Sequence, residues 1–137
     1  MRLVIDNNIW LSFAIGKRLA DLPQMLTRPG LELFAGEAQL AELLRVLSRP
    51  KFLKYISPAR KAETLHLMKQ ASLFVPVLIE NADFSDPKDN YLLDLCQTIL
   101  ADFLVTGDLK LLELGSYPPT KIISFSEFRE MIGGLDR

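Results

Sequence analysis

The stretch Leu3-Val4-Ile5-Asp6-Asn7-Asn8 gives the strongest indication of the fold. Three apolar residues in a row, followed at once by polar residues, are typical of a short buried strand. The same arrangement recurs later in the chain, where Phe103-Leu104-Val105 is followed by Thr106-Gly107-Asp108. Each run therefore predicts a buried strand with an aspartate close to its carboxyl end.

Further helices and strands are predicted around these two runs. Helices are expected from about Asn8, through residues 19–26, over residues 37–47, from Pro58, from Pro87, through Leu111 and Leu112, and over residues 126–131. Additional strands are expected at residues 31–34, 73–75 and 122–123. Strands that alternate with helices imply right-handed crossovers and a parallel sheet. We therefore expect an α/β fold in which a central parallel sheet of about four to five strands is flanked by helices on both faces.

Composition limits the class of protein. The chain has 137 residues, which suits one domain over residues 1–137, and 16 basic and 17 acidic side chains give a net charge of −1. The single cysteine, Cys96, and the single histidine, His66, exclude a disulfide framework and a zinc site built from cysteine and histidine. No apolar run reaches the roughly 18 residues of a membrane helix, and the first residues do not form a signal peptide. We expect a cytoplasmic protein without membrane association, in which any metal is bound by oxygen.

Three aspartates are expected to meet at one edge of the sheet. Asp6 follows the first strand, Asp108 follows the strand at residues 103–105, and Asp89 lies in the first turn of the helix before that strand. Ligands of such sheets bind at the carboxyl ends of the strands. Aspartate is also a favoured helix N-cap, and each of these aspartates stands near the start of a helix. The positions alone therefore leave both roles open.

Two further aspartates have simpler interpretations. Asp86 precedes Pro87, so it is the natural N-cap of the helix that follows, and Asp89 then occupies the third helical position. Asp89 shares a helical face with apolar residues, which predicts that its side chain points into the protein. Asp94 lies on the other side of the same helix and is expected to be solvated.

A group of convergent carboxylates suits a divalent metal. Mg²⁺ and Mn²⁺ are hard cations that prefer oxygen ligands, and carboxylates that face one another repel when no cation lies between them. In phosphodiester cleavage, such metals lower the pKa of a bound water and shield charge on the attacking and leaving oxygens. A nuclease of this kind needs no nucleophile from the protein.

Four segments, in order along the chain, carry a resemblance to a known family. They are Val4-Ile5-Asp6-Asn7-Asn8, the segment 42–52, Asp86-Pro87-Lys88-Asp89-Asn90, and the segment 101–108. Together they resemble PIN domains, and in particular the branch described as toxin components of toxin–antitoxin systems. The resemblance covers nearly the whole chain.

The resemblance implies an endoribonuclease that hydrolyses RNA phosphodiester bonds with a water activated by Mg²⁺ or Mn²⁺ and held by clustered carboxylates. The implied metal ligands, which are also the implied catalytic residues, are Asp6, Glu42, Asp89 and Asp108, with Asp86 as an additional candidate. The implied supporting polar groups are Asn8 and Thr106. The implied partners are an RNA substrate, a cognate antitoxin and a second copy of the chain in a homodimer.

Glu42 is the residue for which the sequence pattern and the resemblance disagree. The predicted helix over residues 37–47 carries an apolar stripe of Leu40, Leu43, Leu44 and Leu47. Glu42 lies nearly opposite this stripe, so the helical period alone predicts a surface glutamate. A ligand role requires protein on that side of the helix as well, and Ala38 and Ala41 are small enough to permit it.

The basic segment, residues 45–61, is the candidate surface for holding RNA. A near-neutral protein needs a local basic patch to bind nucleic acid. The residues predicted to contact RNA are Arg45, Arg49, Lys51 and Lys54, and Arg60 and Lys61 extend the segment. The alternative is that these side chains form the solvated face of a helix pair.

Two other functions fit parts of the pattern. A phosphohydrolase of the haloacid-dehalogenase type uses a strand-end aspartate as nucleophile and an aspartate two residues later as acid. Here the second position is Asn8, which cannot donate a carboxylic proton. The other is a catalytically inactive PIN-like scaffold that binds RNA or a partner protein, and the presence of all four expected acids argues against it. Metal-dependent cleavage of RNA separates the nuclease from the scaffold.

Overall fold

Strands and helices alternate along most of the chain. The computed structural model describes residues 1–16, 19–84 and 86–135. The strands are β1 (Arg2–Ile5), β2 (Glu32–Ala35), β3 (Ser72–Phe74), β4 (Phe103–Val105), β5 (Ser116–Tyr117) and β6 (Thr120–Ile123). The helices are α1 (Asn7–Ile15), α2 (Leu22–Met25), α3 (Glu37–Leu47), the 3₁₀ turn η1 (Pro50–Phe52), α4 (Pro58–Ala71), α5 (Pro87–Ile99), α6 (Leu109–Leu114) and α7 (Phe125–Leu135).

The strands form one sheet in the order β3-β2-β1-β4-β6-β5. All neighbours pair in parallel except β5, which pairs antiparallel with β6. The predicted parallel sheet with helices on both faces is therefore confirmed. The sheet has six strands rather than four to five, because the short β5 is added at the edge. A strand of two residues, following Gly115, is too short to show an alternating pattern in the sequence.

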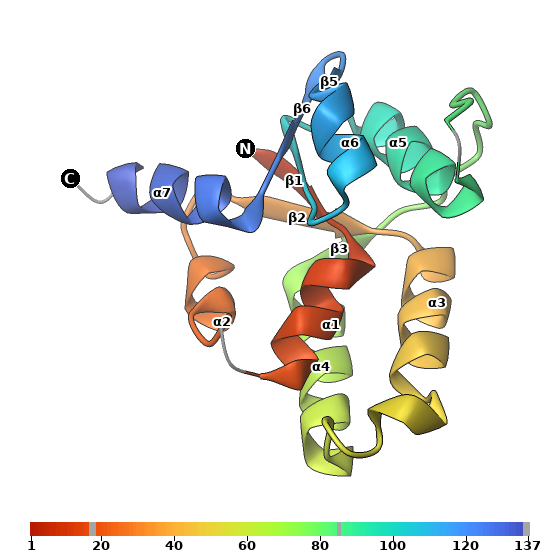
Figure 1. Cartoon of the computed structure of the whole chain (residues 1–137). Coiled ribbons are helices and arrows are strands. Elements are labelled where there is room, and N and C mark those ends of the chain that lie inside the picture. Colours follow the sequence, from red (N-terminus) through yellow and green to blue (C-terminus); the bar gives the residue numbers. More distant parts are fainter. Residues whose placement is uncertain (17–18, 85, 136–137) are drawn as a thin grey trace.

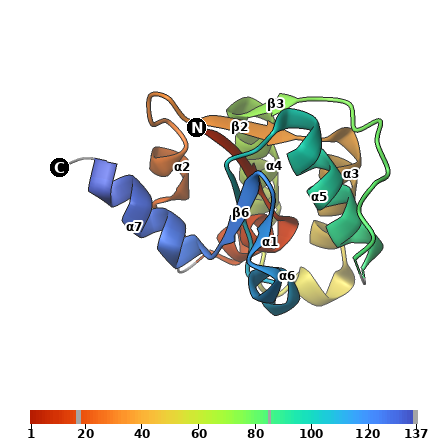
Figure 2. The same cartoon turned by 90° about the horizontal axis from the view of Figure 1, so that it is seen from above.

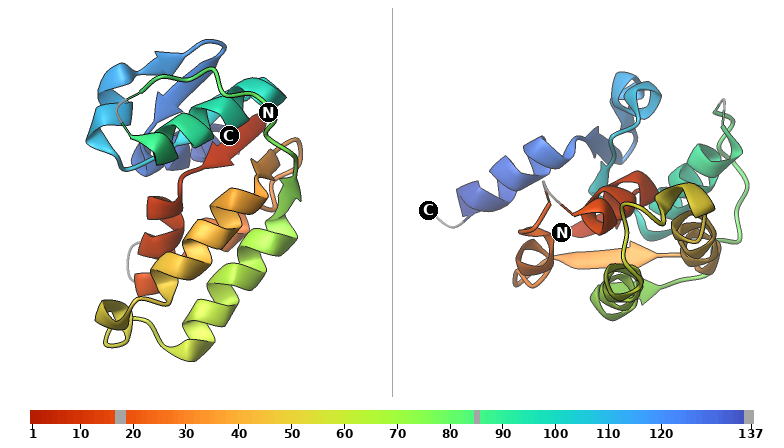
Figure 3. Two further views of the ribbon diagram at one scale, coloured as in Figure 1. Left: turned by 90° about the vertical axis from the view of Figure 1, so that its right-hand side faces the viewer. Right: turned by 60° about the horizontal axis from the view of Figure 1, so that its bottom comes forward.

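Alternate residues of the strands face opposite sides of the sheet. Leu3 and Ile5 belong to a core shared with α1, α2, α3, α4 and α7, whereas Val4 belongs to a second core shared with α5 and α6. Figure 1 shows α1, α3 and α4 on one side of the sheet with α5 and α6 on the other, and Figure 3 shows the same division from its side. In Figure 2, α5 lies over the sheet. Both faces are covered, so the strands consist of nearly continuous apolar runs.

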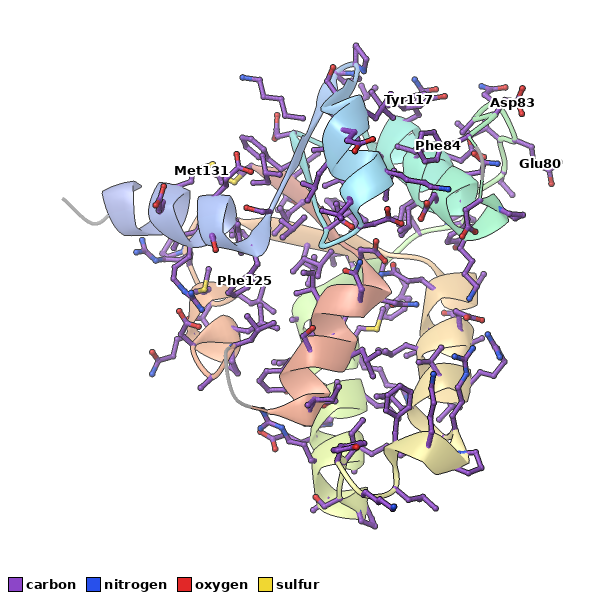
Figure 4. All side chains as sticks on the ribbon, viewed as in Figure 1. Glu80, Asp83, Phe84, Tyr117, Phe125 and Met131 are labelled. Carbon is purple, nitrogen blue, oxygen red and sulfur yellow. The ribbon has the colours of Figure 1, made fainter. Side chains whose placement is uncertain are left out.

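The sheet's second face also holds the loop that precedes α5. Phe84, on this loop, and Tyr117, on β5, pack against the core of α5 and α6. Figure 4 shows both side chains on that side of the molecule, with Glu80 and Asp83 farther out on the loop. No helix in the described ranges is long and apolar enough to cross a membrane.

Two predictions about helix faces were wrong. Asp94 is only 5% exposed and accepts hydrogen bonds from the backbone N–H groups of Asn81 (3.1 Å) and Ala82 (2.8 Å). It is buried because the loop before α5 folds back over a side of the helix that the apolar stripe does not reach. Leu44, which belongs to the apolar stripe expected to be buried, is 47% exposed, whereas the polar Gln39 is buried and donates to the Ile5 carbonyl at the end of β1 (2.6 Å).

Candidate active site

A cleft of about 470 Å³ opens at the carboxyl ends of β1 and β4, between α3 and α5. It lies at the edge of the sheet where ligands of parallel α/β folds bind. All four residues predicted as metal ligands line it, namely Asp6, Glu42, Asp89 and Asp108, and Asp86 lines it too. Four separate segments of the chain thus bring acidic side chains to one cleft: the end of β1, helix α3, the start of α5 and the end of β4.

Asp6 lies at the floor of the cleft, directly after β1. Its backbone N–H donates to the Val105 carbonyl (2.9 Å), which keeps the ends of β1 and β4 paired. The residue is 8% exposed, and its carboxylate accepts hydrogen bonds from the Thr106 hydroxyl (2.8 Å) and from the Asn8 N–H (3.5 Å). Burial raises the pKa of Asp6, repulsion from Asp108 adds to the rise, and the bond from Thr106 opposes it.

Thr106 and Asn8 fix the loop between β4 and α6 through hydrogen bonds. The fully buried Thr106 hydroxyl donates to Asp6 and accepts from the Asp108 N–H (3.0 Å) and from Asn8 Nδ2 (3.4 Å). Asn8 Oδ1 accepts from the Gly107 N–H (3.2 Å). This network ties the Asp6 and Asp108 positions together, since one hydroxyl contacts both residues.

Asp6, Asp86 and Asp108 line the cleft and also cap helices. Asp108 accepts from the N–H groups of Lys110 (2.8 Å) and Leu111 (3.4 Å) at the start of α6. Asp86 accepts from the Lys88 N–H (2.9 Å) at the start of α5, as its position before proline predicted. Capping and ligand roles are compatible for Asp86 and Asp108, because the capping bonds of each use one carboxylate oxygen, whereas Asp6 caps through Oδ1 and accepts from Thr106 through Oδ2.

Asp89 is the acid of the cleft whose pKa its surroundings shift most. It is 6% exposed, which confirms that it points into the protein, and its Oδ2 is buried without a hydrogen-bond partner. Burial, followed by repulsion from Asp108, Asp6 and Asp86, raises its pKa to about 7. The carboxylate is thus held where its negative charge is poorly compensated, which is a typical preparation for binding a cation or a proton.

Glu42 lies apart from this electrostatic group. Its side chain is 25% exposed, and both oxygens are occupied by cations: Arg45 binds Oε1 (2.6 Å) and Oε2 (3.0 Å), and Lys88 binds Oε1 (2.8 Å). These two neighbours lower the pKa of Glu42 to about 2. The structure therefore places Glu42 at the cleft, as the family resemblance implied, but pairs it with basic residues instead of the aspartates.

The residues of the cleft fit a divalent cation chemically. Within the described ranges, no three Asp, Glu, Cys or His side chains already converge on one metal position, so binding an ion requires some side-chain movement. The available donors are nevertheless oxygens, which Mg²⁺ and Mn²⁺ prefer. Three oxygens of residues that line the cleft are buried without hydrogen-bond partners: Asn7 Oδ1, Gln39 Oε1 and Asp89 Oδ2.

Several contacts that shape the cleft could not be predicted from the sequence. Asn7 Nδ2 donates to the Gln39 carbonyl (3.0 Å), which joins α1 to α3. A Cβ on Gly36 would overlap the Tyr91 hydroxyl and ring, so any other residue would force Tyr91 to move where α5 approaches the start of α3. The Tyr91 hydroxyl accepts from the Ala38 N–H there. In the sequence, the contact is reflected only in the choice of glycine as the N-cap of α3, a position where a side chain usually caps the helix.

The basic segment is divided between structural and exposed side chains. Arg60 donates to the Phe13 carbonyl (2.8 Å), and Lys61 Nζ donates to the Ser48 hydroxyl (2.7 Å). Arg45 reaches the cleft through Glu42, whereas Lys54 is exposed beside a separate hollow. Of the residues predicted to contact RNA, Arg45 is the one that contacts an acid lining the cleft, namely Glu42.

Comparison with known proteins identifies the family. A family model described as "PIN domain" matches residues 2–110, and the chain belongs to this family. No curated protein matches it. Among solved structures, the fold is similar to that of a chain in the crystal structure of VapBC2 from Rickettsia felis bound to a DNA fragment from their promoter. The TM-score is 0.62 at 14% identity, covering 91% of this chain and 99% of that one, and this likeness shows a shared fold.

Proposed function

We propose that this protein is a ribonuclease that depends on Mg²⁺ or Mn²⁺. The observation that carries the proposal is the group formed by Asp6, Asp89 and Asp108, whose mutual repulsion and burial favour an added cation. A buried carboxylate with a pKa near neutrality in a cleft is more typical of a functional site than of a structural one. Membership of the PIN-domain family supports a nuclease.

The roles of the residues follow from their contacts. Asp6, Asp89 and Asp108 would hold the metal, with Glu42 and Asp86 at the edge of the site. A divalent metal bound here would supply a nucleophilic water at neutral pH and would neutralise charge on the phosphate. Thr106 orients Asp6 by donating to it (2.8 Å) and opposes the rise in its pKa that burial causes, and Asn8 fixes the loop that carries Asp108.

The substrate that fits this cleft is unpaired RNA. The acids lie in a recess between α3 and α5, and a single strand or loop can reach such a site with its backbone exposed. Arg45, Arg49, Lys51 and Lys54 are proposed to hold the strand beyond the cleft. A triple variant in which Arg49, Lys51 and Lys54 are replaced together by Gln tests this proposed contact with RNA.

We further propose that the chain is the toxin of a toxin–antitoxin pair. The motifs resemble the toxin branch of the family, which supports a cognate antitoxin and a homodimer as partners. Expression of the wild-type chain alone should slow the growth of its host, whereas an Asp6→Asn copy at the same level should not. Equal growth inhibition by both forms would separate toxicity from the acidic site.

Cleavage of RNA tests the proposed activity. Purified protein is incubated with a mixed RNA pool in Mn²⁺ or in EDTA, and the products are resolved on a gel. We expect cleavage only with Mn²⁺, lost in Asp89→Asn and retained in Asp83→Asn. Asp83 is an exposed acid of the loop before α5, so it controls for the change of charge. No metal-dependent cleavage across many RNAs would favour the inactive PIN-like scaffold.

A further inference from the structure

Lys88 lies at the mouth of the cleft and joins its two walls. It belongs to the first turn of α5, one residue before Asp89, and its Nζ is 2.8 Å from Glu42 Oε1 on α3. Its side chain is 59% exposed, compared with 25% for Glu42. The lysine therefore reaches from solvent to an acid at the edge of the proposed metal site.

This contact is not needed to balance the charge of Glu42. Arg45 already binds both oxygens of that carboxylate in a two-point pair, so Lys88 is a second cation on one negative charge. A partly exposed ion pair of this kind contributes little to folding.

The position of Lys88 is also electrostatically unfavourable for helix α5. Positive charge in the first turn of a helix is unfavourable, because the amino end of the helix carries partial positive charge. Lys88 is the second residue of α5, after Pro87. Neither the helix nor the ion pair accounts for a lysine here, and local electrostatic conflicts of this kind are expected at functional positions.

We propose that Lys88 binds a phosphate of the RNA substrate, and that Glu42 holds the lysine at the cleft mouth until a divalent metal ion binds Glu42. This inference rests on the proposed function. Metal and Lys88 compete for Oε1 of Glu42, because this oxygen contacts both Arg45 and Lys88 and has room for a metal only after one of them leaves. Of the two cations, Lys88 is the one suited to leave, because a lysine is a flexible point charge whereas Arg45 is held at two points.

Release of Lys88 would couple metal binding to substrate binding. The freed ammonium group would lie next to the metal, which is where the scissile phosphate has to lie. Because coupling between two binding events is reciprocal, metal strengthens RNA binding and RNA strengthens metal binding. Removing the lysine should strengthen the binding of metal, because Lys88 no longer competes for Glu42, and should weaken the binding of RNA, because the phosphate contact is lost.

Lys88→Met tests the inference, with Lys69→Met as control. Lys69 is exposed on α4, so its replacement removes the same charge outside the cleft. Mn²⁺ alone is titrated into each protein by calorimetry. Lys88→Met should bind Mn²⁺ about two- to fivefold more tightly than wild type, the range expected when a partly exposed ion pair no longer competes. Lys69→Met should match wild type.

Binding of a labelled single-stranded RNA, checked for intactness after each titration, gives the second readout. In Mn²⁺, Lys88→Met should bind RNA more weakly, and the slope of log affinity against log salt should fall by about 0.7, the value for one phosphate contact on a single strand. In EDTA the variant should differ less from wild type, because Glu42 then still holds the lysine.

The outcomes separate this inference from the proposed function. Unchanged or weaker Mn²⁺ binding by Lys88→Met contradicts the competition for Glu42, and an unchanged salt slope contradicts the phosphate contact. An Asp89→Asn variant is titrated in parallel. If Asp89→Asn loses Mn²⁺ binding but Lys88→Met behaves like wild type, the proposed role of Lys88 is wrong and the proposed metal site stands. If Asp89→Asn binds Mn²⁺ as well as wild type, the proposed metal site is wrong too.

Discussion

Replacing Asp89 with Asn should make the protein more stable in EDTA, and the gain should grow with pH. The folded protein keeps a proton on Asp89 up to a pH of about 7, whereas the unfolded chain loses it near the ordinary value of 3.8. Between these values the folded state binds more protons than the unfolded state. The contribution of Asp89 to stability therefore falls as the pH rises through this window.

The size of the effect follows from the site. The rise in the pKa of Asp89 from 3.8 to about 7 corresponds to about 4 kcal/mol against the ionised form. Asp108 is half-buried and Asp86 is exposed, so water screens part of their repulsion. Removing a negative charge near the start of α5 costs about 0.5 kcal/mol. The expected net gain at about pH 8 is about 1–2 kcal/mol, since repulsion outweighs the lost helix interaction.

Thermal unfolding of wild type and Asp89→Asn in EDTA, at about pH 5 and about pH 8, measures this effect. At the higher pH the variant should melt roughly 4–8 °C above wild type for a chain of this size. The gap should shrink at the lower pH. With Mn²⁺ the order should reverse, because only wild type gains fully from bound metal. A variant no more stable than wild type at about pH 8, or a gap independent of pH, would refute the reasoning.

Three further predictions test other parts of the structure. Asp108→Asn remains a good N-cap, so in EDTA it should be more stable than wild type by about 1 kcal/mol, and it should gain less from Mn²⁺ in a melting experiment. Gly36→Ala should lower the free energy of unfolding by about 1–3 kcal/mol in urea denaturation. Combining it with Tyr91→Leu should restore part of that loss, because the overlapping ring is removed. The triple variant should weaken RNA binding and lower its salt slope by up to about one per lost phosphate contact, and an unchanged slope would leave the basic segment a solvated face.

Much of the fold was predictable because its signals are local. Five of the strands contain a short apolar run, and Ser57 and Asp86 cap their helices directly before proline, so both helix starts follow from the sequence. Asp6 and Asp108 could be placed together because each follows a strand of a parallel sheet, and such strands end at one edge. β5 was missed because its two residues show no period.

The rest of the site depends on contacts between elements that are distant in sequence. Helical periodicity identifies the face that meets the main core, but it does not show what covers the other faces. Asp94 was therefore assigned to solvent although a loop covers it, and Glu42 looked like a surface residue although α5 brings Lys88 to it. The contact between Gly36 and Tyr91 could not be predicted either, because it joins the start of α3 to α5, which are far apart in the sequence.

Diffraction from crystals soaked in Mn²⁺ tests the central claim most directly, because the anomalous signal locates the metal without reference to activity. The account predicts a peak inside the cleft, within coordination distance of the Asp89 carboxylate and bordered by Asp6 and Asp108. The same soak of an Asp89→Asn crystal should show a weaker peak or none. A fully soaked wild-type crystal with no peak in the cleft, or with metal bound only to acids elsewhere on the surface, would contradict the assignment of this site.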